Sequence, residues 1–208
     1  MNKDYSDQAL RDHCPHCDRN SFAYEFLLEE YPLFSVTCDA HPLREGHLLI
    51  IPKRHVSCIG EYTQAELAAF KEIYERVSTW IEKHYGAVAT FEHGKIGQTV
   101  FHSHVHLLPF SGEPLQILPE GADRMCPLSV LDELLPLFQK KGGYLYFSLG
   151  PHMWIVDPAL GQPRFFRDRF ARALGRGERA NWKATRQNPA LLQAGREENQ
   201  RCSKLFLQ

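Results

Sequence analysis

Apolar and polar residues follow two different periods along the chain, and the clearer one is helical. Between Thr63 and Tyr85, apolar residues recur every three or four positions, as in a helix with one apolar face: Leu67, Phe70, Ile73, Tyr74, Val77 and Ile81. Thr63 followed by Glu66 is the pattern of a capping box, and Gly86 is a typical stop signal. We therefore predict a helix to about Tyr85 that lays its apolar side on a sheet.

Shorter segments in which apolar and polar residues alternate flank this helix and predict strands. Three precede the helix and two follow it: Phe22–Leu28, Leu33–Cys38, His47–Ile51, Ala87–Glu92 and His102–Pro109. This order of elements is typical of an α+β fold, in which one helix crosses an antiparallel sheet.

The part of the chain after residue 112 predicts a separate, smaller unit of α/β type. Residues 112–126 contain glycine, proline and polar residues and indicate a loop at a domain boundary. Beyond it we expect a helix, a β-hairpin and a basic helix: Pro127–Lys140, Tyr144–Leu149 with His152–Val156, and Arg164 to about Leu174. The residues that follow are polar, and we expect them to be irregular. The chain is thus divided into residues 1–112 and a C-terminal extension, residues 113–208.

Three histidines, His102, His104 and His106, stand at every second position in the last strand of the first unit. Residues i, i+2 and i+4 of a strand share one face, so the three imidazoles should lie side by side. Each ring carries two nitrogens that need partners, which makes such a row poor core packing. An exposed edge strand would explain it without chemistry. The usual uses are metal ligation, or a nucleophile flanked by groups that fix its tautomer.

The segment 97–108, GQTVFHSHVHLL, resembles the signature of the histidine-triad (HIT) superfamily. That signature is His-x-His-x-His followed by two apolar residues and preceded by Gly-Gln-Ser/Thr-Val. A second block, GHLLIIPKRH at residues 46–55, resembles the earlier strand of the family. The resemblance covers roughly residues 14–110 and is much weaker beyond residue 125. It implies a HIT-like antiparallel sheet with a long helix across it, as a nucleotide-binding and catalytic domain.

The resemblance also implies an enzyme, a nucleotidyl hydrolase or transferase acting at the α-phosphate of a nucleotide conjugate of adenylylated or dinucleoside-polyphosphate type. In the family the middle histidine attacks phosphorus and forms a nucleotidyl-histidine, which assigns His104 as the nucleophile. His106 matches the position beside the transferred phosphate. Gln98 and Thr99 match positions that contact the phosphate or the leaving group. Asp39 matches an acidic residue that binds the ribose hydroxyls.

The chain departs from the family pattern just before the triad. Phe91 stands where many small family members have an asparagine that helps to hold the phosphate. Its loss puts the leaving-group chemistry in doubt. Glu92, His93 and Lys95 are candidates to replace it, and nothing in the sequence decides among them.

Cys14 and Cys17 form a Cys-x-x-Cys pair, which can be half of a zinc site or a redox pair. A closed structural zinc site needs four ligands. Zinc-bearing HIT proteins take the other two from the histidine that ends the Ile-Pro-Lys-x-His block and from the first triad histidine. The resemblance therefore implies a structural zinc ion held by Cys14, Cys17, His55 and His102. We leave His47 unassigned, and expect the isolated His41 to be exposed or structural.

The bulk composition is that of an ordinary soluble globular protein, with 208 residues, 43% hydrophobic and 24% charged. No apolar run approaches the roughly 18 residues of a membrane span, and the polar start is no signal peptide. We therefore expect a cytoplasmic protein whose six cysteines stay reduced. By resemblance, a homodimer through the sheet edge and the helix is expected.

Charge is distributed unevenly along the chain. Residues 164–208 carry a net charge of +7, and the preceding 163 residues carry −8. A basic segment usually marks a solvated helix face, and its functional interpretation is an arm that binds polyphosphate or a nucleic-acid backbone. Two alternatives to a small-molecule enzyme therefore stay open: a nucleic-acid 5′-end deadenylating or decapping enzyme, and a nucleotide-binding protein without turnover.

Overall fold

The helix predicted from the apolar stripe is present as α2, Gln64–Tyr85, in the computed structural model, which describes residues 13–208. Its capping box forms as expected: the Glu66 amide donates to the Thr63 hydroxyl, and the Thr63 amide donates to the Glu66 carboxylate. The helix ends at Gly86, whose φ of +88° favours glycine. The predicted stripe packs against the sheet.

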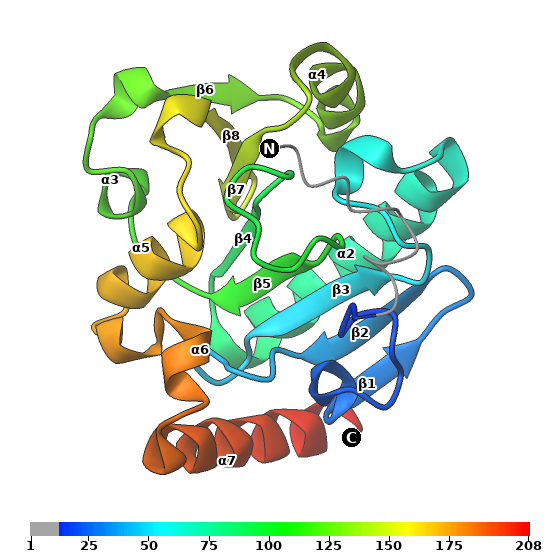
Figure 1. Ribbon diagram of the computed structural model, residues 1–208, viewed down its shortest axis with the longest axis vertical. Helices are drawn as coiled ribbons and strands as arrows, with labels where there is room; N and C mark the ends of the chain where they lie inside the picture. Colours follow the sequence, from blue (N-terminus) through cyan, green and yellow to red (C-terminus); the bar gives the residue numbers. More distant parts are fainter. Residues whose placement is uncertain (1–12) are drawn as a thin grey trace.

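Eight antiparallel strands form one sheet in the order β1-β2-β3-β5-β4-β7-β8-β6 (Figure 1). Their bounds are Leu27–Glu30 (β1), Phe34–Cys38 (β2), Leu48–Pro52 (β3), Val88–Glu92 (β4), Val105–Pro109 (β5), Met125–Leu128 (β6), Leu145–Leu149 (β7) and His152–Val156 (β8). The α+β class is therefore confirmed.

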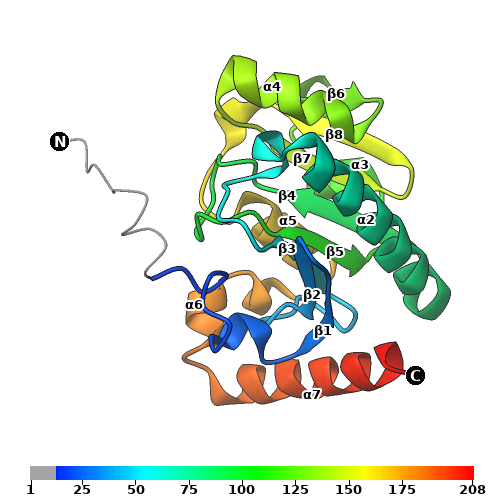
Figure 2. The same ribbon diagram turned by 90° about the vertical axis from the view of Figure 1, so that its right-hand side faces the viewer.

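Two apolar cores lie on opposite faces of this sheet (Figure 2). On one face, α2 packs against alternate residues such as Val36, Ile50 and Leu107. On the other, α5 (Phe165–Ala173) and the short helix α3 (Pro114–Ile117) pack against Ala89 and Phe91 of β4. The central strands are buried on both faces because both sides of the sheet are covered.

The C-terminal extension continues the sheet of the first unit. β7 pairs with β4, with Ala89 opposite Leu149 and Phe91 opposite Phe147, and β8 and β6 follow outward. The division into two domains at residue 112 and the homodimer stay predictions. The pairing means that β1 and β6 are the two outer strands, so the β4 edge is not available to a partner.

Two predicted strands of the first unit are shorter than expected. The segment Phe22–Leu28 begins as a 3-10 helix, Phe22–Tyr24, capped by the Ser21 hydroxyl, and only its last residues enter β1. The expected strand His102–Pro109 begins only at Val105. His102 and His104 therefore lie in the loop before β5, where the Ser103 amide donates to the Val56 carbonyl.

The segment Pro127–Lys140 is not one helix, contrary to the prediction. Its start belongs to β6, an outer strand, where Pro127 is tolerated because its missing N–H costs fewer ladder hydrogen bonds. The helix, α4, covers only Leu134–Lys141. The other predicted elements of the extension, the hairpin β7–β8 and the basic helix α5, are present. Further 3-10 helices lie at Ile59–Glu61, Ala122–Arg124, Leu131–Glu133, Pro158–Leu160 and Gly177–Arg179.

The last residues were expected to be irregular, and this prediction was wrong. They form α6 (Trp182–Thr185) and the 18-residue helix α7 (Pro189–Phe206), which begins with an Asn188 cap and a proline in its first turn. α7 runs beside β1 and β2, far from β6 and β8, and buries Asn199 and Cys202 (Figures 1 and 2). No helix within residues 13–208 is long and apolar enough to cross a membrane.

Candidate active site and metal centre

The three triad histidines do not share one strand face. His106 lies in β5, opposite Leu49 of β3 and Phe91 of β4, and its ring stacks on Phe91 with 4.2 Å between ring centroids. The ring centroids of His104 and His106 are 5.0 Å apart, and both side chains line one cavity. His102 turns away from it toward Cys14 and Cys17. The triad therefore divides into two pocket residues and one metal-site residue.

His104 has a defined tautomer. Its Nδ1 lies 2.6 Å from the backbone carbonyl of His102, and a carbonyl can only accept a hydrogen bond. Nδ1 therefore carries the hydrogen, and Nε2 keeps its lone pair. Burial lowers the pKa of His104, which favours the neutral ring. Such a ring can act as a nucleophile near neutral pH.

The tautomer of His106 follows from a chain of hydrogen bonds that starts in the backbone. The Leu43 amide donates to Nδ1 of His47 at 3.1 Å, so the hydrogen of His47 lies on Nε2. That Nε2 is 2.9 Å from Nδ1 of His106 and donates to it. The hydrogen of His106 is therefore on Nε2, which is buried and has no partner among residues 13–208. This N–H is a donor available to a ligand.

Asp39 lies between the triad and the extension. One carboxylate oxygen accepts from the His41 amide at 2.8 Å, and the other accepts from Arg167 at 2.7 Å. Arg167 also donates to the His41 carbonyl at 2.7 Å. Burial alone would raise the pKa of Asp39, but the charge of Arg167 holds it well below its usual range. The site therefore contains a buried ion pair that joins β2 to α5.

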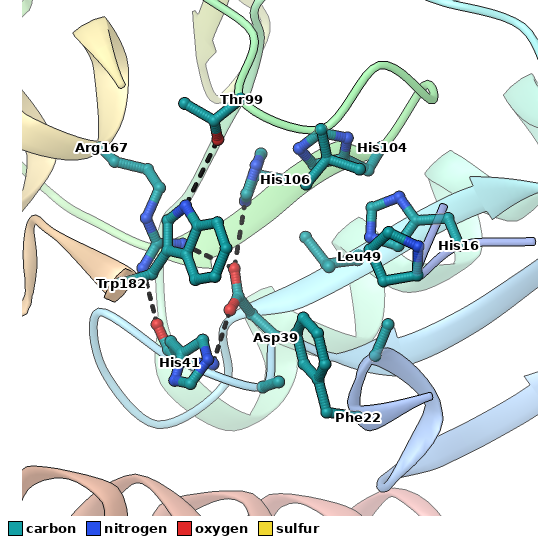
Figure 3. A pocket seen from close by; sticks show the side chains of 14 residues that line it. His16, Phe22, Asp39, His41, Leu49, Thr99, His104, His106, Arg167 and Trp182 are labelled. Carbon is teal, nitrogen blue, oxygen red and sulfur yellow. Dashed lines mark hydrogen bonds and ion pairs between the residues drawn. The ribbon is translucent and has the colours of Figure 1, made fainter. Parts of the chain in front are cut away.

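A cavity opens between these groups (Figure 3). Its wall includes the predicted site residues Asp39, Thr99, His104 and His106, together with residues that the sequence did not indicate: His16, Phe22, His41, Arg167 and Trp182. The Trp182 indole N–H donates to the Thr99 hydroxyl at 3.3 Å. Gln98 does not line the cavity, since its side-chain amide donates to the Ser57 carbonyl.

None of the three residues that could replace the family asparagine at Phe91, namely Glu92, His93 and Lys95, takes its place in the structure. Glu92 is buried on the far side of the triad loop, where it accepts from the Ser103 hydroxyl at 2.8 Å. His93 accepts from the Phe166 amide, and Lys95 lies over the Phe138 ring. None of the three lines the cavity. The permanent cation that does line it is Arg167, from the extension.

Cys14, Cys17, His55 and His102 meet as predicted, with one ligand atom from each lying within 4.8 Å of all the others. Nδ1 of His102 is 3.4 Å from both thiol sulfurs, and Nδ1 of His55 is 3.2 Å from that of Cys17. Tetrahedral zinc separates such atoms by about 3.3–3.8 Å. Nε2 of His102 donates to the Pro52 carbonyl at 2.8 Å, which turns the lone pair of Nδ1 toward the thiols. The group can therefore hold a metal ion.

Several residues of the site were not predicted from the sequence, and the reasons can be identified. His16 lies between the two cysteines, yet its ring packs on His104 at 4.8 Å instead of joining the metal group. His41 was expected to be exposed or structural. It is buried, and both ring nitrogens lack partners among residues 13–208. His47 belongs to the second family block and was left unassigned. Arg167 and Trp182 lie in the extension, within a Phe-Phe-Arg…Leu-Gly…Trp segment that is only weakly similar to longer HIT-related proteins and implies no role for either residue.

Comparison with known proteins agrees with this geometry. Residues 21–112 match the HIT domain family model. This segment of the chain is a HIT domain. The HIT domain contains Asp39, the triad and His55, whereas the Cys-x-x-Cys pair precedes it and Arg167 and Trp182 follow it.

Relatives of the HIT domain cover only part of the chain. Over 72 residues, 33% of this chain, it is 39% identical to the nitrilase and fragile histidine triad fusion protein NitFhit of Caenorhabditis elegans and 35% identical to the bis(5′-adenosyl)-triphosphatase of Dictyostelium discoideum. The chain spans 16% and 48% of their lengths. A solved histidine triad nucleotide-binding protein of Sulfolobus tokodaii is 30% identical over 48% of this chain and 71% of its own, with a TM-score of 0.41.

Proposed function

We propose that this protein is a nucleotidyl hydrolase or transferase that acts at the α-phosphate of a nucleotide conjugate through a covalent nucleotidyl-His104. The observation that carries the proposal is the hydrogen bond from Nδ1 of His104 to the His102 carbonyl, because it leaves a nucleophilic Nε2 in a neutral ring. Two relatives, named as a bis(5′-adenosyl)-triphosphatase and an adenylylsulfatase, support hydrolysis of nucleotide conjugates.

The reaction proceeds in two displacements at phosphorus. Nε2 of His104 forms a bond to the α-phosphorus, and the bond from phosphorus to the leaving group breaks with its electron pair going to the leaving group. Water, phosphate or another acceptor then attacks the same phosphorus, the bond to His104 breaks with its electron pair returning to Nε2, and the proton of an attacking water passes to solvent. Throughout, the Nε2 hydrogen of His106 is a donor to the phosphoryl oxygens, whose negative charge increases in the transition state.

Asp39 is proposed to bind the ribose hydroxyls. Its Oδ1 accepts one hydrogen bond, from the His41 amide, and has a second lone pair for a hydroxyl donor, whereas Oδ2 accepts from Arg167 and lies 3.4 Å from Nδ1 of His106. Arg167 keeps this carboxylate ionised and fixes its orientation. Thr99, at the cavity wall, is proposed to contact the phosphate or the leaving group, and Gln98 to do so only after leaving the Ser57 carbonyl.

The ion held by Cys14, Cys17, His55 and His102 is proposed to be structural zinc. Bound there, zinc supplies a rigid crosslink between the N-terminal segment and the triad loop. His102 contributes its side chain to the metal group and its carbonyl to His104. Immobilising His102 therefore also immobilises the acceptor that sets the tautomer of the nucleophile.

Intact-mass spectrometry tests the proposal directly. The wild-type protein and His104→Ala are incubated with adenylyl, guanylyl and uridylyl donors, and the mass is measured after rapid quenching in denaturant at alkaline pH, which preserves the acid-labile P–N bond. We expect a gain of one nucleoside monophosphate, or steady product release, in the wild type only. Activity of His104→Ala equal to that of the wild type would refute the covalent mechanism.

A further inference from the structure

Two buried thiols meet outside the triad cavity, at the junction of β2 and α7. Cys38 ends β2 and Cys202 lies in α7, and their exposed fractions are 1% and 0%. Both belong to the apolar core on the α2 face of the sheet. The sulfur of Cys38 is 4.0 Å from the carbonyl oxygen of Asn199, which precedes Cys202 by about one helical turn. The two side chains therefore share one small region of the core.

A hydrogen bond joins the two thiols, with Cys38 as the donor and Cys202 as the acceptor. This hydrogen bond raises the pKa of Cys38 and lowers that of Cys202. The Gly46 amide also donates to the Cys202 sulfur. Because the thiolate is the attacking form in thiol–disulfide exchange, Cys202 is the member of the pair that reacts first.

The backbone already holds the two residues near the separation that a disulfide needs. Cα atoms of α7 and β2 approach within 8 Å of each other. Bridged cysteines have Cα atoms about 4.4–6.8 Å apart, and hydrogen-bonded thiols have only the last ångströms to close before an S–S bond of about 2 Å can form. α7 also lies beside β2 in both views of the fold (Figures 1 and 2). A small shift of the helix is therefore enough to join the two sulfurs.

Thiols this deeply buried are oxidised only when the element that covers them opens. The buried residues of α7 are Gly195, Glu198, Asn199 and Cys202, so the helix contributes mainly small or polar side chains to the core. Polar ties hold it in place, such as the ion pair of Glu198 with Arg179 at 2.6 Å. Elements with few buried apolar contacts open at a lower free energy than the centre of a fold. We therefore expect α7 to expose Cys202 by local opening, while the sheet stays folded.

We propose that Cys38 and Cys202 are a site of reversible disulfide formation, which fastens α7 to β2. The oxidant is a low-molecular-weight disulfide such as oxidised glutathione. The Cys202 thiolate attacks one sulfur of this disulfide, and the S–S bond breaks and releases one thiol, which takes up the proton that Cys202 lost. When α7 returns to the sheet, Cys38 attacks the Cys202 sulfur, and its proton leaves with the second released thiol. Two protein thiols are thus oxidised, and one disulfide is reduced to two thiols.

The disulfide acts on the loop that carries Asp39, the residue next to Cys38. Asn199 of α7 donates to the Asp39 carbonyl at 2.9 Å. Glu198 of the same helix pairs with two arginines that in turn donate to the carbonyls of residues 42 and 43. Holding α7 on the sheet therefore also holds residues 39–43 in place. This effect does not depend on the reaction proposed at His104.

Peptide mapping without reduction tests the site in the zinc-loaded protein. The wild type is equilibrated with oxidised glutathione, quenched with N-ethylmaleimide in denaturant, and digested with trypsin. Trypsin places Cys38 in the peptide 20–44 and Cys202 in the peptide 202–204, and neither peptide contains a second cysteine. We expect a disulfide between these two peptides in most molecules, and at least tenfold slower hydrogen exchange of the α7 amides once it has formed. Dithiothreitol should reverse both changes.

Two variants separate this disulfide from other oxidation. Cys126→Ser removes an exposed thiol and should leave both the disulfide and the protection of α7 unchanged. Cys202→Ser cannot form the disulfide, so oxidised glutathione should not slow the exchange of its α7 amides. Absence of the linked peptides at an oxidant concentration that converts Cys126 of the wild type to a mixed disulfide would overturn the proposal. So would a link that forms only in urea, or exchange of α7 that stays the same after the link has formed.

Discussion

The buried carboxyl group of Glu92 should make the free energy of unfolding depend on pH, and its hydrogen bonds support the loop that carries His104. Its carboxyl group is buried at 1% exposure and contacts the hydroxyls of Ser103 and Tyr144, at 2.8 and 2.5 Å, and the Ile59 amide. Burial raises its pKa from 4.5 to about 7, although these hydrogen bonds favour the ionised form. Ser103 lies between His102 and His104, so this network supports the loop that carries the nucleophile.

The sign of the pH dependence follows from this raised pKa. The folded protein binds the proton more tightly than the unfolded chain, so the contribution of Glu92 to stability is complete below pH 4.5 and decreases as the pH rises to 7. With these two pKa values, the free energy of unfolding falls by about 2.5 kcal/mol between pH 5 and pH 8 through this group alone. Glu92→Gln keeps the shape of the neutral acid and does not titrate.

Urea titrations of the zinc-loaded protein at several pH values measure this effect. The free energy of unfolding of the wild type should fall relative to that of Glu92→Gln as the pH rises, while the contribution of the metal site cancels in the difference. Glu75→Gln, an exposed carboxylate on α2, is the control and should parallel the wild type. Parallel curves for the wild type and Glu92→Gln would refute the assignment of a buried, protonated carboxyl group.

Three further predictions concern the site itself. Cys17→Ser should bind less than half an equivalent of zinc by metal analysis; full occupancy would contradict the proposed ligand set. Arg167→Met leaves the Asp39 charge buried and should lower the free energy of unfolding in urea by about 3–5 kcal/mol; adding Asp39→Asn should recover most of the loss, and no recovery would contradict the ion pair. Because burial lowers the pKa of His104, kcat/KM should be constant above pH 6.5 and fall in acid; a profile still rising at pH 7 would contradict a neutral nucleophile.

The helices and strands that were predicted correctly are those whose local residue pattern matches the contacts they make in the fold. The capping box and apolar stripe of α2, the strands β2 to β5 and the hairpin β7–β8 all combine a periodic pattern with clear stop residues. α7 was missed because its buried face contains Gly195, Glu198 and Asn199, which are polar or small. Their burial depends on ion pairs and hydrogen bonds to distant residues, and no local pattern records these.

From the sequence we predicted the triad histidines and the metal-site residues, but not the residue of the extension that pairs with Asp39. The metal group was predicted from the Cys-x-x-Cys pair and two family positions, and the structure brings all four residues together. Arg167 could not be found in this way, because 128 residues separate it from Asp39. The positions of His102 and His104 were also predicted incorrectly, since a strand period cannot show that pairing begins only at Val105.

The distribution of charge in the site bears on how the proposed phosphate-bearing substrate would be recognised. His104 and His106 are neutral, since burial lowers the pKa of both, and Arg167 is compensated by Asp39. The triad cavity therefore has little net charge with which to attract a phosphate. Lys183 and Arg186, which form no ion pair with a carboxylate of residues 13–208, line a hollow that shares Phe22, Thr99 and Trp182 with the triad cavity. In the proposed function, attraction over distance would then come from the extension, and His104 and His106 would act at contact through directed lone pairs and N–H groups. For this reason we expect added salt to slow turnover of an anionic nucleotide conjugate through KM and to leave kcat nearly unchanged.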